Sequence, residues 1–231
     1  MSNNKKKPVK NESSGMTAVI AVLVALATVI VAIGVFSAIK MVNPDFLKWE
    51  KPFKSAYKET NEVTTYVKLS VKDHGDIVME LYPDVAPATV ANFQMLVHDK
   101  FYDGLTFHRI IQDFMIQGGD PKGDGTGGSG TTIKGEFEKN GVTNELSHIT
   151  GVISMARRST PMDSATSQFF ICNSDASDNL DGSYAAFGYV VAGLDTVMSI
   201  SDVKVTANAG GEMSKPVEPV TIVSVCFVKK N

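Results

Sequence analysis

The 231-residue sequence predicts a mainly β domain that follows one N-terminal transmembrane helix. Two observations support this fold class. Residues 17–39 contain no charged side chain, and from about Val63 short apolar segments alternate with turns rather than with regularly repeated helices. Such strands form an antiparallel sheet closed into a barrel or a sandwich. We divide the chain into a basic cytoplasmic tail (1–16), an anchor (17–39), a juxtamembrane stalk (40–62) and a folded domain (63–231).

The composition is that of a folded protein, because 43% of the residues are apolar and 20% are charged. A fibrous or wholly disordered chain is excluded. Charge is unevenly distributed: the tail carries four Lys and one Glu, whereas residues 63–231 carry 13 basic and 20 acidic side chains. An acidic domain is repelled by phosphate backbones, so nucleic acid is not expected as a partner.

Residues 17–39 are long enough to span a membrane. At about 1.5 Å per residue the segment reaches roughly 34 Å as a helix, and a hydrocarbon core is about 30 Å thick. We interpret it as an uncleaved signal anchor, because a cleavable signal peptide has an apolar core of only about 7–15 residues. The alternative is a buried core helix, which rarely lacks a polar face over such a length.

The orientation of the anchor does not follow from the number of lysines, because four lie close to each of its ends. They are Lys5, Lys6, Lys7 and Lys10 on one side, and Lys40, Lys48, Lys51 and Lys54 on the other. We favour a cytoplasmic N-terminus, because the first cluster is dense and large domains translocate readily behind one anchor. The chain is then a single-pass protein of the cell membrane with its domain outside the cytoplasm. Attachment to the inner surface is the alternative, and Trp49 suits either the membrane interface or packing on the domain.

The folded domain begins with a predicted β-hairpin. Its two strands place Val67, Leu69 and Val71, and then Ile77, Met79 and Leu81, on one face around a turn at 73–76. A helix follows, with Pro87 in its first turn and Val90, Phe93, Leu96 and Val97 on one face. Further strands are expected at 106–111, 114–117, 152–156, 168–172 and 220–228, and a second short helix at 195–201.

Several motifs fail on inspection. Residues 125–130 match G-x-G-x-x-G, but a strand-like run follows where a dinucleotide site requires a helix. Residues 177–188 imitate a calcium loop without its final Glu, and the four His lack metal-ligand spacing. No metal or other cofactor is therefore expected. Cys172 and Cys226 lie in apolar runs typical of buried thiols, with a disulfide as the alternative if their strands adjoin.

Six segments are specific as an ordered set. They are FHRII at 107–111, FMIQGGD at 114–120, GTGG at 125–128, VISMA at 152–156, SQFFI at 167–171 and LDG at 180–182. In this order they resemble the cyclophilin-type peptidyl-prolyl cis-trans isomerases, bacterial branch, over about residues 64–229. The resemblance implies a closed eight-stranded antiparallel β-barrel capped by two helices, with the active site on its outer face.

Prolyl isomerisation suits these residues chemically. Rotation about an X–Pro bond faces a barrier of about 18–20 kcal/mol, and lowering it requires no nucleophile or metal. The catalyst holds the proline ring in an apolar pocket and directs a donor at the twisting nitrogen. By resemblance, Arg109 and Gln117 are catalytic. The substrate-binding residues implied are Phe114, Met115, Ala156, Arg157, Gln168, Phe170, Leu180 and Tyr184.

Each of these residues also has a simpler interpretation. The apolar ones could be core and Arg109 a surface ion-pair partner. His108 is expected to be structural, and Phe107 and Phe169 to face the core.

Three departures from the family pattern affect the site. Asn179 replaces a Trp, which removes an aromatic wall and speaks against cyclosporin binding. Tyr184 replaces a His and keeps an aromatic edge. Arg157 and Arg158 replace small residues and favour acidic neighbours in the substrate.

The sequence thus predicts a membrane-anchored isomerase that acts on Pro-containing polypeptides and assists the folding of exported proteins. A non-catalytic chaperone or adaptor with the same fold is the alternative.

Overall fold

The computed structural model describes residues 56–231. The predicted cytoplasmic tail, the anchor at 17–39 and most of the stalk lie outside the described residues. Within 56–231, no helix combines the length and the apolar character needed to cross a membrane.

The described chain is mainly β, as predicted. Nine strands form one sheet: β1 (Tyr57–Glu59), β2 (Tyr66–Val71), β3 (Gly75–Leu81), β4 (Arg109–Ile111), β5 (Met115–Gly118), β6 (Val152–Met155), β7 (Phe169–Cys172), β8 (Ala186–Ala192) and β11 (Ile222–Lys230). Their order is β1-β11-β2-β3-β8-β6-β7-β5-β4, and all neighbours are antiparallel. A separate hairpin consists of β9 (Val205–Ala207) and β10 (Met213–Pro216).

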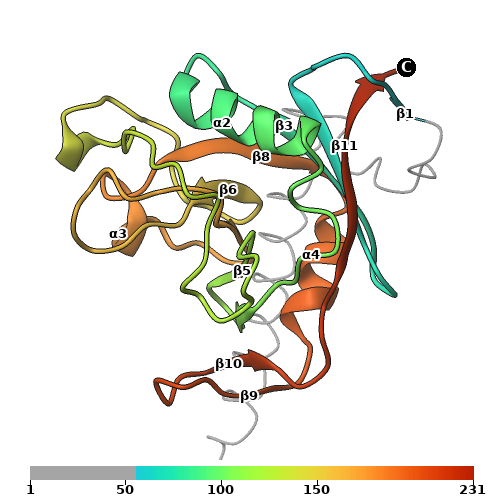
Figure 1. Cartoon of the computed structure of the whole chain (residues 1–231), viewed down its shortest axis with the longest axis vertical. Helices are drawn as coiled ribbons and strands as arrows, with labels where there is room; N and C mark the ends of the chain where they lie inside the picture. Colours follow the sequence, from blue (N-terminus) through green and yellow to red (C-terminus); the bar gives the residue numbers. More distant parts are fainter. Residues whose placement is uncertain (1–55) are drawn as a thin grey trace, which may run out of the picture. The chain divides into compact units, whose positions relative to one another are not determined.

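The helices are short, and two were predicted. They are α2 (Pro87–His98), α3 (Ser177–Leu180) and α4 (Leu194–Ser201), with a 3₁₀ turn at Glu138–Asn140. The expected helices after Pro87 and at 195–201 are confirmed by α2 and α4. In Figure 1, α2 lies at the top of the view, α3 at the left, and the β9–β10 hairpin at the end opposite α2.

The prediction of a closed eight-stranded barrel is wrong. The sheet is open, with β1 and β4 at its edges. Thr106 forms isolated bridges to Thr221, just before β11, and to Asp120, just after β5. The Phe107 amide donates to the carbonyl of Val220 at 3.0 Å. The expected strand at 106–111 is therefore shortened to β4, and Thr106 pairs through these two isolated bridges instead.

Strand β8 was not predicted, although it lies in the middle of the sheet between β3 and β6. Most of its side chains are buried, so the strand lacks the period-2 alternation that reveals half-buried strands. Gly188 is required there, because a Cβ atom would lie 2.5 Å from the Glu80 carbonyl oxygen.

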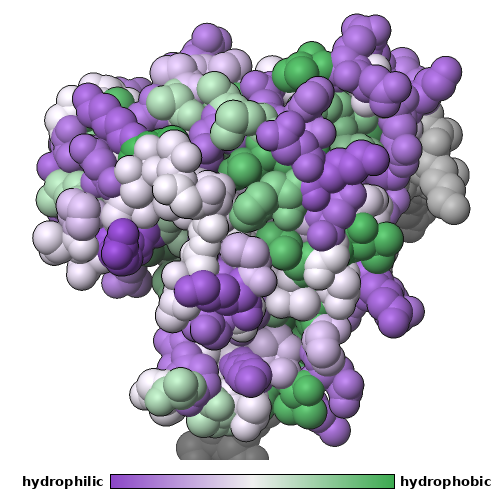
Figure 2. Space-filling model, viewed as in Figure 1, coloured by the Kyte–Doolittle hydropathy of each residue, from purple (hydrophilic) through white to green (hydrophobic). Residues whose placement is uncertain are grey.

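The core follows the alternation seen in the sequence. Val67, Leu69 and Val71 are buried on β2, and their neighbours are partly exposed, which confirms the predicted hairpin face. Phe107 and Phe169 are also buried, as predicted, and their ring centroids lie 6.1 Å apart. On the face shown in Figure 2, hydrophobic residues reach the surface mainly in a band across the middle, bordered by hydrophilic side chains.

The two cysteines are free thiols. Cys172 is buried in β7, and burial raises the pKa of its thiol to about 12. Cys226 is half-buried in β11. The expectation of a buried thiol therefore holds for Cys172 but not for Cys226, and the structure does not contain the alternative disulfide.

Candidate active site

Three neighbouring strands, β4, β5 and β7, display four of the predicted site residues on one face. In the β4–β5 pair Arg109 lies opposite Gln117, and in the β5–β7 pair Gln117 lies opposite Phe170. Residues directly opposite one another in antiparallel strands share a face, as do residues two apart on one strand. Met115 therefore joins Arg109, Gln117 and Phe170 on this side of the sheet.

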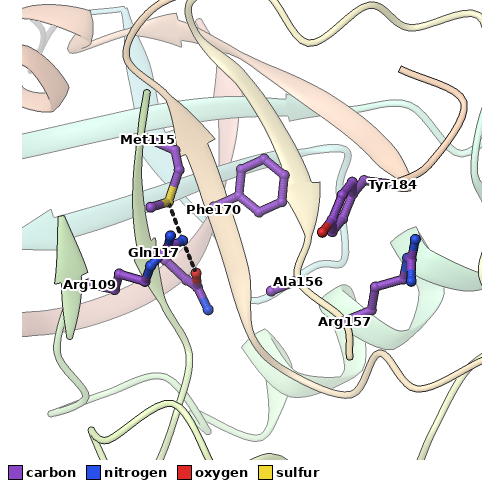
Figure 3. Close-up of a pocket in the computed structure, with 7 residues that line it drawn as sticks. All are labelled: Arg109, Met115, Gln117, Ala156, Arg157, Phe170 and Tyr184. Atoms are coloured by element: carbon purple, nitrogen blue, oxygen red, sulfur yellow. Dashed lines mark hydrogen bonds between the residues drawn. The ribbon is translucent and has the colours of Figure 1, made fainter. Parts of the chain in front are cut away.

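These side chains surround a pocket of about 140 Å³. Seven residues line it: Arg109, Met115, Gln117, Ala156, Arg157, Phe170 and Tyr184. Figure 3 shows Phe170 between Arg109, Met115 and Gln117 on one side and Tyr184 and Arg157 on the other. A cavity of about 150 Å³ lined by apolar side chains accommodates a benzene molecule, so this pocket is large enough for a proline ring.

An apolar cluster lies beneath the pocket. Met115, Phe170, Cys172, Ala176 and Leu180 are buried together, with Ile111, Phe114, Ala156 and Tyr184 packed against them. The ring of Tyr184 meets that of Phe170 edge-on at 5.8 Å between centroids. Phe114 and Leu180 thus belong to the supporting cluster rather than to the lining of the pocket. Asn179, at the position of the absent Trp, is exposed on α3 and does not line the pocket either.

A chain of hydrogen bonds orients the two glutamines. Gln168 donates its Nε2 to the carbonyls of Gly127 at 2.8 Å and Gly125 at 3.1 Å. Its Oε1 then accepts from Nε2 of Gln117 at 2.9 Å. This arrangement leaves Oε1 of Gln117 facing Nη1 of Arg109 at 3.3 Å. The Gly-rich loop, which the sequence assigned to structure rather than to nucleotide binding, therefore fixes Gln117 through Gln168.

Arg109 has a second partner that the sequence did not reveal. Its Nε and Nη2 donate to the two carboxylate oxygens of Glu212, each at 2.7 Å. This bidentate pair holds the pKa of the Glu212 carboxyl at about 2. Glu212 is 103 residues away in the chain, at the β9–β10 turn, and lies beyond the last of the six ordered segments. No sequence signal pointed to it.

Arg157 forms a rigid wall of the pocket. Its guanidinium carbon lies 4.8 Å from the ring centroids of both Phe137 and Tyr184. Its Nε donates to the Ser183 carbonyl at 2.8 Å. A guanidinium held between two rings loses little freedom when a substrate binds.

A polar triplet of buried His148 and Ser154 with exposed Asp181 lies behind Phe170. The His148 ring stacks on that of Phe170 with centroids 6.0 Å apart. Its Nδ1 is 2.7 Å from Oδ1 of Asp181, and its Nε2 is 2.9 Å from Oγ of Ser154. The order of contacts is that of a hydrolase triad, but Ser154 is 0% exposed, so its hydroxyl cannot reach a substrate. The triplet supports the pocket wall instead.

His108, next to Arg109, is held apart from the pocket. Both of its ring nitrogens are buried without a hydrogen-bond partner among the described residues. Burial lowers the pKa of its imidazole, so the neutral form is favoured. Within residues 56–231, no group of three His, Cys, Asp or Glu side chains is arranged to hold a metal ion.

Comparison with known proteins matches the chain to one family. Residues 66–226 match the family described as cyclophilin type peptidyl-prolyl cis-trans isomerase/CLD. Peptidyl-prolyl cis-trans isomerase B of Bacillus subtilis is 46% identical over 132 residues, which cover 57% of this chain and 87% of that protein. A peptidyl-prolyl cis-trans isomerase of Acinetobacter baylyi is 41% identical over 159 residues, with 65% and 79% covered.

A solved structure is also similar. It is the cyclophilin type peptidyl-prolyl cis-trans isomerase of Cryptosporidium parvum, determined in the presence of the dipeptide Ala-Pro. The TM-score is 0.63 at 29% sequence identity, and the match covers 72% of this chain and 99% of that one.

Proposed function

Because the chain belongs to the cyclophilin-type peptidyl-prolyl cis-trans isomerases and is an isomerase, we propose that it twists X–Pro bonds in the Arg109–Phe170 pocket without a covalent intermediate. One observation carries this proposal. The Nη1 donor of Arg109 and the amide of Gln117 meet at the edge of a pocket whose floor is Met115 and Phe170.

The apolar floor would hold the proline ring while the bond rotates. Met115 and Phe170 are 1% and 4% exposed, so their positions are set by the cluster beneath them. They offer an apolar surface for the ring, which favours a Pro side chain over a charged one. The relative solved with Ala-Pro is consistent with a Pro-containing substrate.

Arg109 would stabilise the twisted bond. As the amide rotates, conjugation is lost and the nitrogen acquires a lone pair that the planar ground state lacks. A donor placed at that nitrogen binds the twisted state more strongly than either planar isomer, which is the condition for catalysis. A guanidinium remains protonated throughout, so the step transfers no proton. Gln117 would grip the flanking backbone and hold Nη1 in place.

The first prediction concerns Arg109→Ala in the full chain. We expect prolyl-isomerase turnover of a Pro-containing test peptide to fall about a hundredfold, the loss typical of removing one preorganised charged donor. Lys204→Ala, which removes an exposed cation outside the pocket, is the matched control and should retain full turnover.

A folded Arg109→Ala variant as fast as the parent chain would refute the role of Arg109. A parent chain that binds the peptide but does not accelerate isomerisation would instead support the adaptor alternative.

We further propose that residues 17–39 anchor the chain in the cell membrane, with the isomerase domain outside the cytoplasm, where it would assist exported proteins. The support is the 23-residue uncharged run behind a dense Lys cluster. We expect the full chain to sediment with bacterial membranes and resist carbonate extraction, and its domain to be digested by protease added to spheroplasts.

The matched variant for this test is Leu26→Arg with Ile30→Arg, which places two charges in the middle of the segment and should release the chain from the membrane. A parent chain that stays soluble would overturn the anchor. A membrane-bound chain whose domain resists protease until lysis would place the domain on the inner surface.

A further inference from the structure

Glu212 lies outside every motif that led to the family. It occupies the turn of the β9–β10 hairpin, which Figure 1 shows at the end of the described chain opposite α2. We propose that Glu212 is a positioning residue that holds Arg109 so that Nη1 is directed into the pocket. This inference rests on the catalytic role proposed above for Arg109.

The contacts of Arg109 divide its guanidinium into two edges. The Nε–Nη2 edge is occupied by both oxygens of Glu212 at 2.7 Å. Nη1 instead lies 3.3 Å from Oε1 of Gln117 and 3.8 Å from the sulfur of Met115, both of which line the pocket (Figure 3). A bidentate carboxylate fixes the plane of a guanidinium as well as its position. Rotation that removed Nη1 from the pocket would break both bonds to Glu212.

Glu212 is itself held by its hairpin. The amides of Gly210 and Glu212 donate to Oδ1 of Asn208 at 2.9 and 3.1 Å, and the Asn208 amide donates to the Glu212 carbonyl at 2.8 Å. Nδ2 of Asn208 donates to Oγ of the buried Ser214 at 3.1 Å and to Oε2 of Glu212 at 3.3 Å. The carboxylate is therefore a fixed partner rather than a mobile surface charge.

In the Arg109–Glu212 pair, the benefit of fixing the guanidinium in place exceeds the cost of a nearby negative charge. A nearby carboxylate reduces the positive field of Arg109, which by itself would weaken the donor. However, the side chains are 30% and 40% exposed, so water screens that effect. Without Glu212, the Arg109 side chain on the three-residue edge strand β4 would lose conformational entropy each time it adopted the catalytic position. Preorganised donors avoid that cost at the transition state.

This role predicts a specific kinetic signature. Loss of Glu212 leaves the apolar floor and Gln168 unchanged, so the ground-state affinity for substrate should be retained. The donor acts on the twisted bond, so the loss should fall on kcat and not on KM. We expect kcat of Glu212→Ala to fall about tenfold, which corresponds to an interaction energy in the range found for residues in direct contact.

The experiment measures kcat and KM of the full chain on a Pro-containing test peptide. Glu212→Asp keeps the carboxylate and should recover part of the lost rate. Glu212→Gln offers only one acceptor to two N–H donors and should be intermediate between the parent and Glu212→Ala. Glu218→Ala removes an exposed acid from the segment after β10 and is the matched control, with unchanged kinetics expected.

A double-mutant cycle distinguishes this role from a structural one. In an Arg109→Ala background, Glu212→Ala should cause no further loss. An equal loss in both backgrounds, or a Glu212→Ala enzyme as fast as the parent, would overturn the positioning role. If Glu212→Ala does not fold, as judged by its melting transition, the Gln and Asp variants decide the same question. Full activity in Arg109→Ala alone would refute the proposed function of Arg109, whatever Glu212 does.

Discussion

His148 shows how a single buried residue supports the pocket. The ring is 1% exposed and stacks on Phe170, and both of its nitrogens are hydrogen-bonded, one to Asp181 and one to Ser154. Burial lowers the pKa of the imidazole, and this effect exceeds the opposing influence of Asp181. The folded state therefore favours neutral His148.

This shift predicts a dependence of stability on pH. In the unfolded chain His148 titrates near its ordinary pKa of 6.5, whereas in the folded protein it titrates lower. Below pH 6.5 the unfolded state thus binds more protons, so the stabilisation is complete above that pH and is lost as the pH falls through the folded pKa. We expect the free energy of unfolding, measured with urea, to decline from pH 7 to pH 5. His148→Asn should reduce that slope.

The control for this prediction is Asn179→Ala, which changes an exposed, non-titrating side chain on α3 and should leave the slope unchanged. Part of the slope should survive in His148→Asn, because burial lowers the pKa of His108 in the same direction. A slope in His148→Asn equal to that of the parent chain would contradict the assignment.

At the scale of one element, helix α2 is completed by a distant residue. Pro87 begins the helix, but its N-cap makes no side-chain hydrogen bond and its first turn contains no acidic residue. Instead, Glu136 accepts from the amides of Ala88 at 3.0 Å and Thr89 at 2.8 Å, and from the Thr89 hydroxyl at 2.7 Å. The carboxylate satisfies amides that have no partner inside the helix and interacts favourably with its positive end.

We therefore expect Glu136→Gln to destabilise the fold by about 1–3 kcal/mol, because a buried charged acceptor is replaced by a neutral amide with one acceptor oxygen. Urea denaturation at neutral pH measures this loss. Glu145→Gln, at an exposed position in the following loop, is the control and should unfold at the same urea concentration as the parent chain. Equal stability of Glu136→Gln and the parent would show that water can replace the carboxylate at this helix end.

The β9–β10 hairpin illustrates what local patterns miss. Its strands have only three and four residues and are separated by a Gly-rich turn, so no hydrophobic period distinguishes it. Its Gly211 adopts φ +83°, which allows the reversal just before Glu212. The hairpin nevertheless supplies the closest ionic partner of Arg109, through a contact that depends on how it docks beside β4.

At the scale of the whole molecule, the site is assembled from segments that are far apart in the chain. Arg109 and Met115 come from β4 and β5, Phe170 from β7, and Tyr184 from the loop before β8. The antiparallel register brings them together, since each pairing places the next side chain on the same face. The ordered motifs identified most of these residues, because the residues of that face lie within the motif segments of the sequence.

The sequence by itself determined the mainly β fold class, the first hairpin and helices α2 and α4, and by family resemblance it predicted a wider set of site residues that includes the seven lining the pocket. These features could be predicted because they depend on hydrophobic periods and motifs within short segments. The period follows from the direction in which successive side chains point along a helix or a strand. Only the tertiary structure decided that the sheet is open, that β8 lies at its centre, and that Glu212 and Glu136 meet Arg109 and α2. These contacts join residues dozens of positions apart, and their geometry depends on how whole elements pack, which no local pattern specifies.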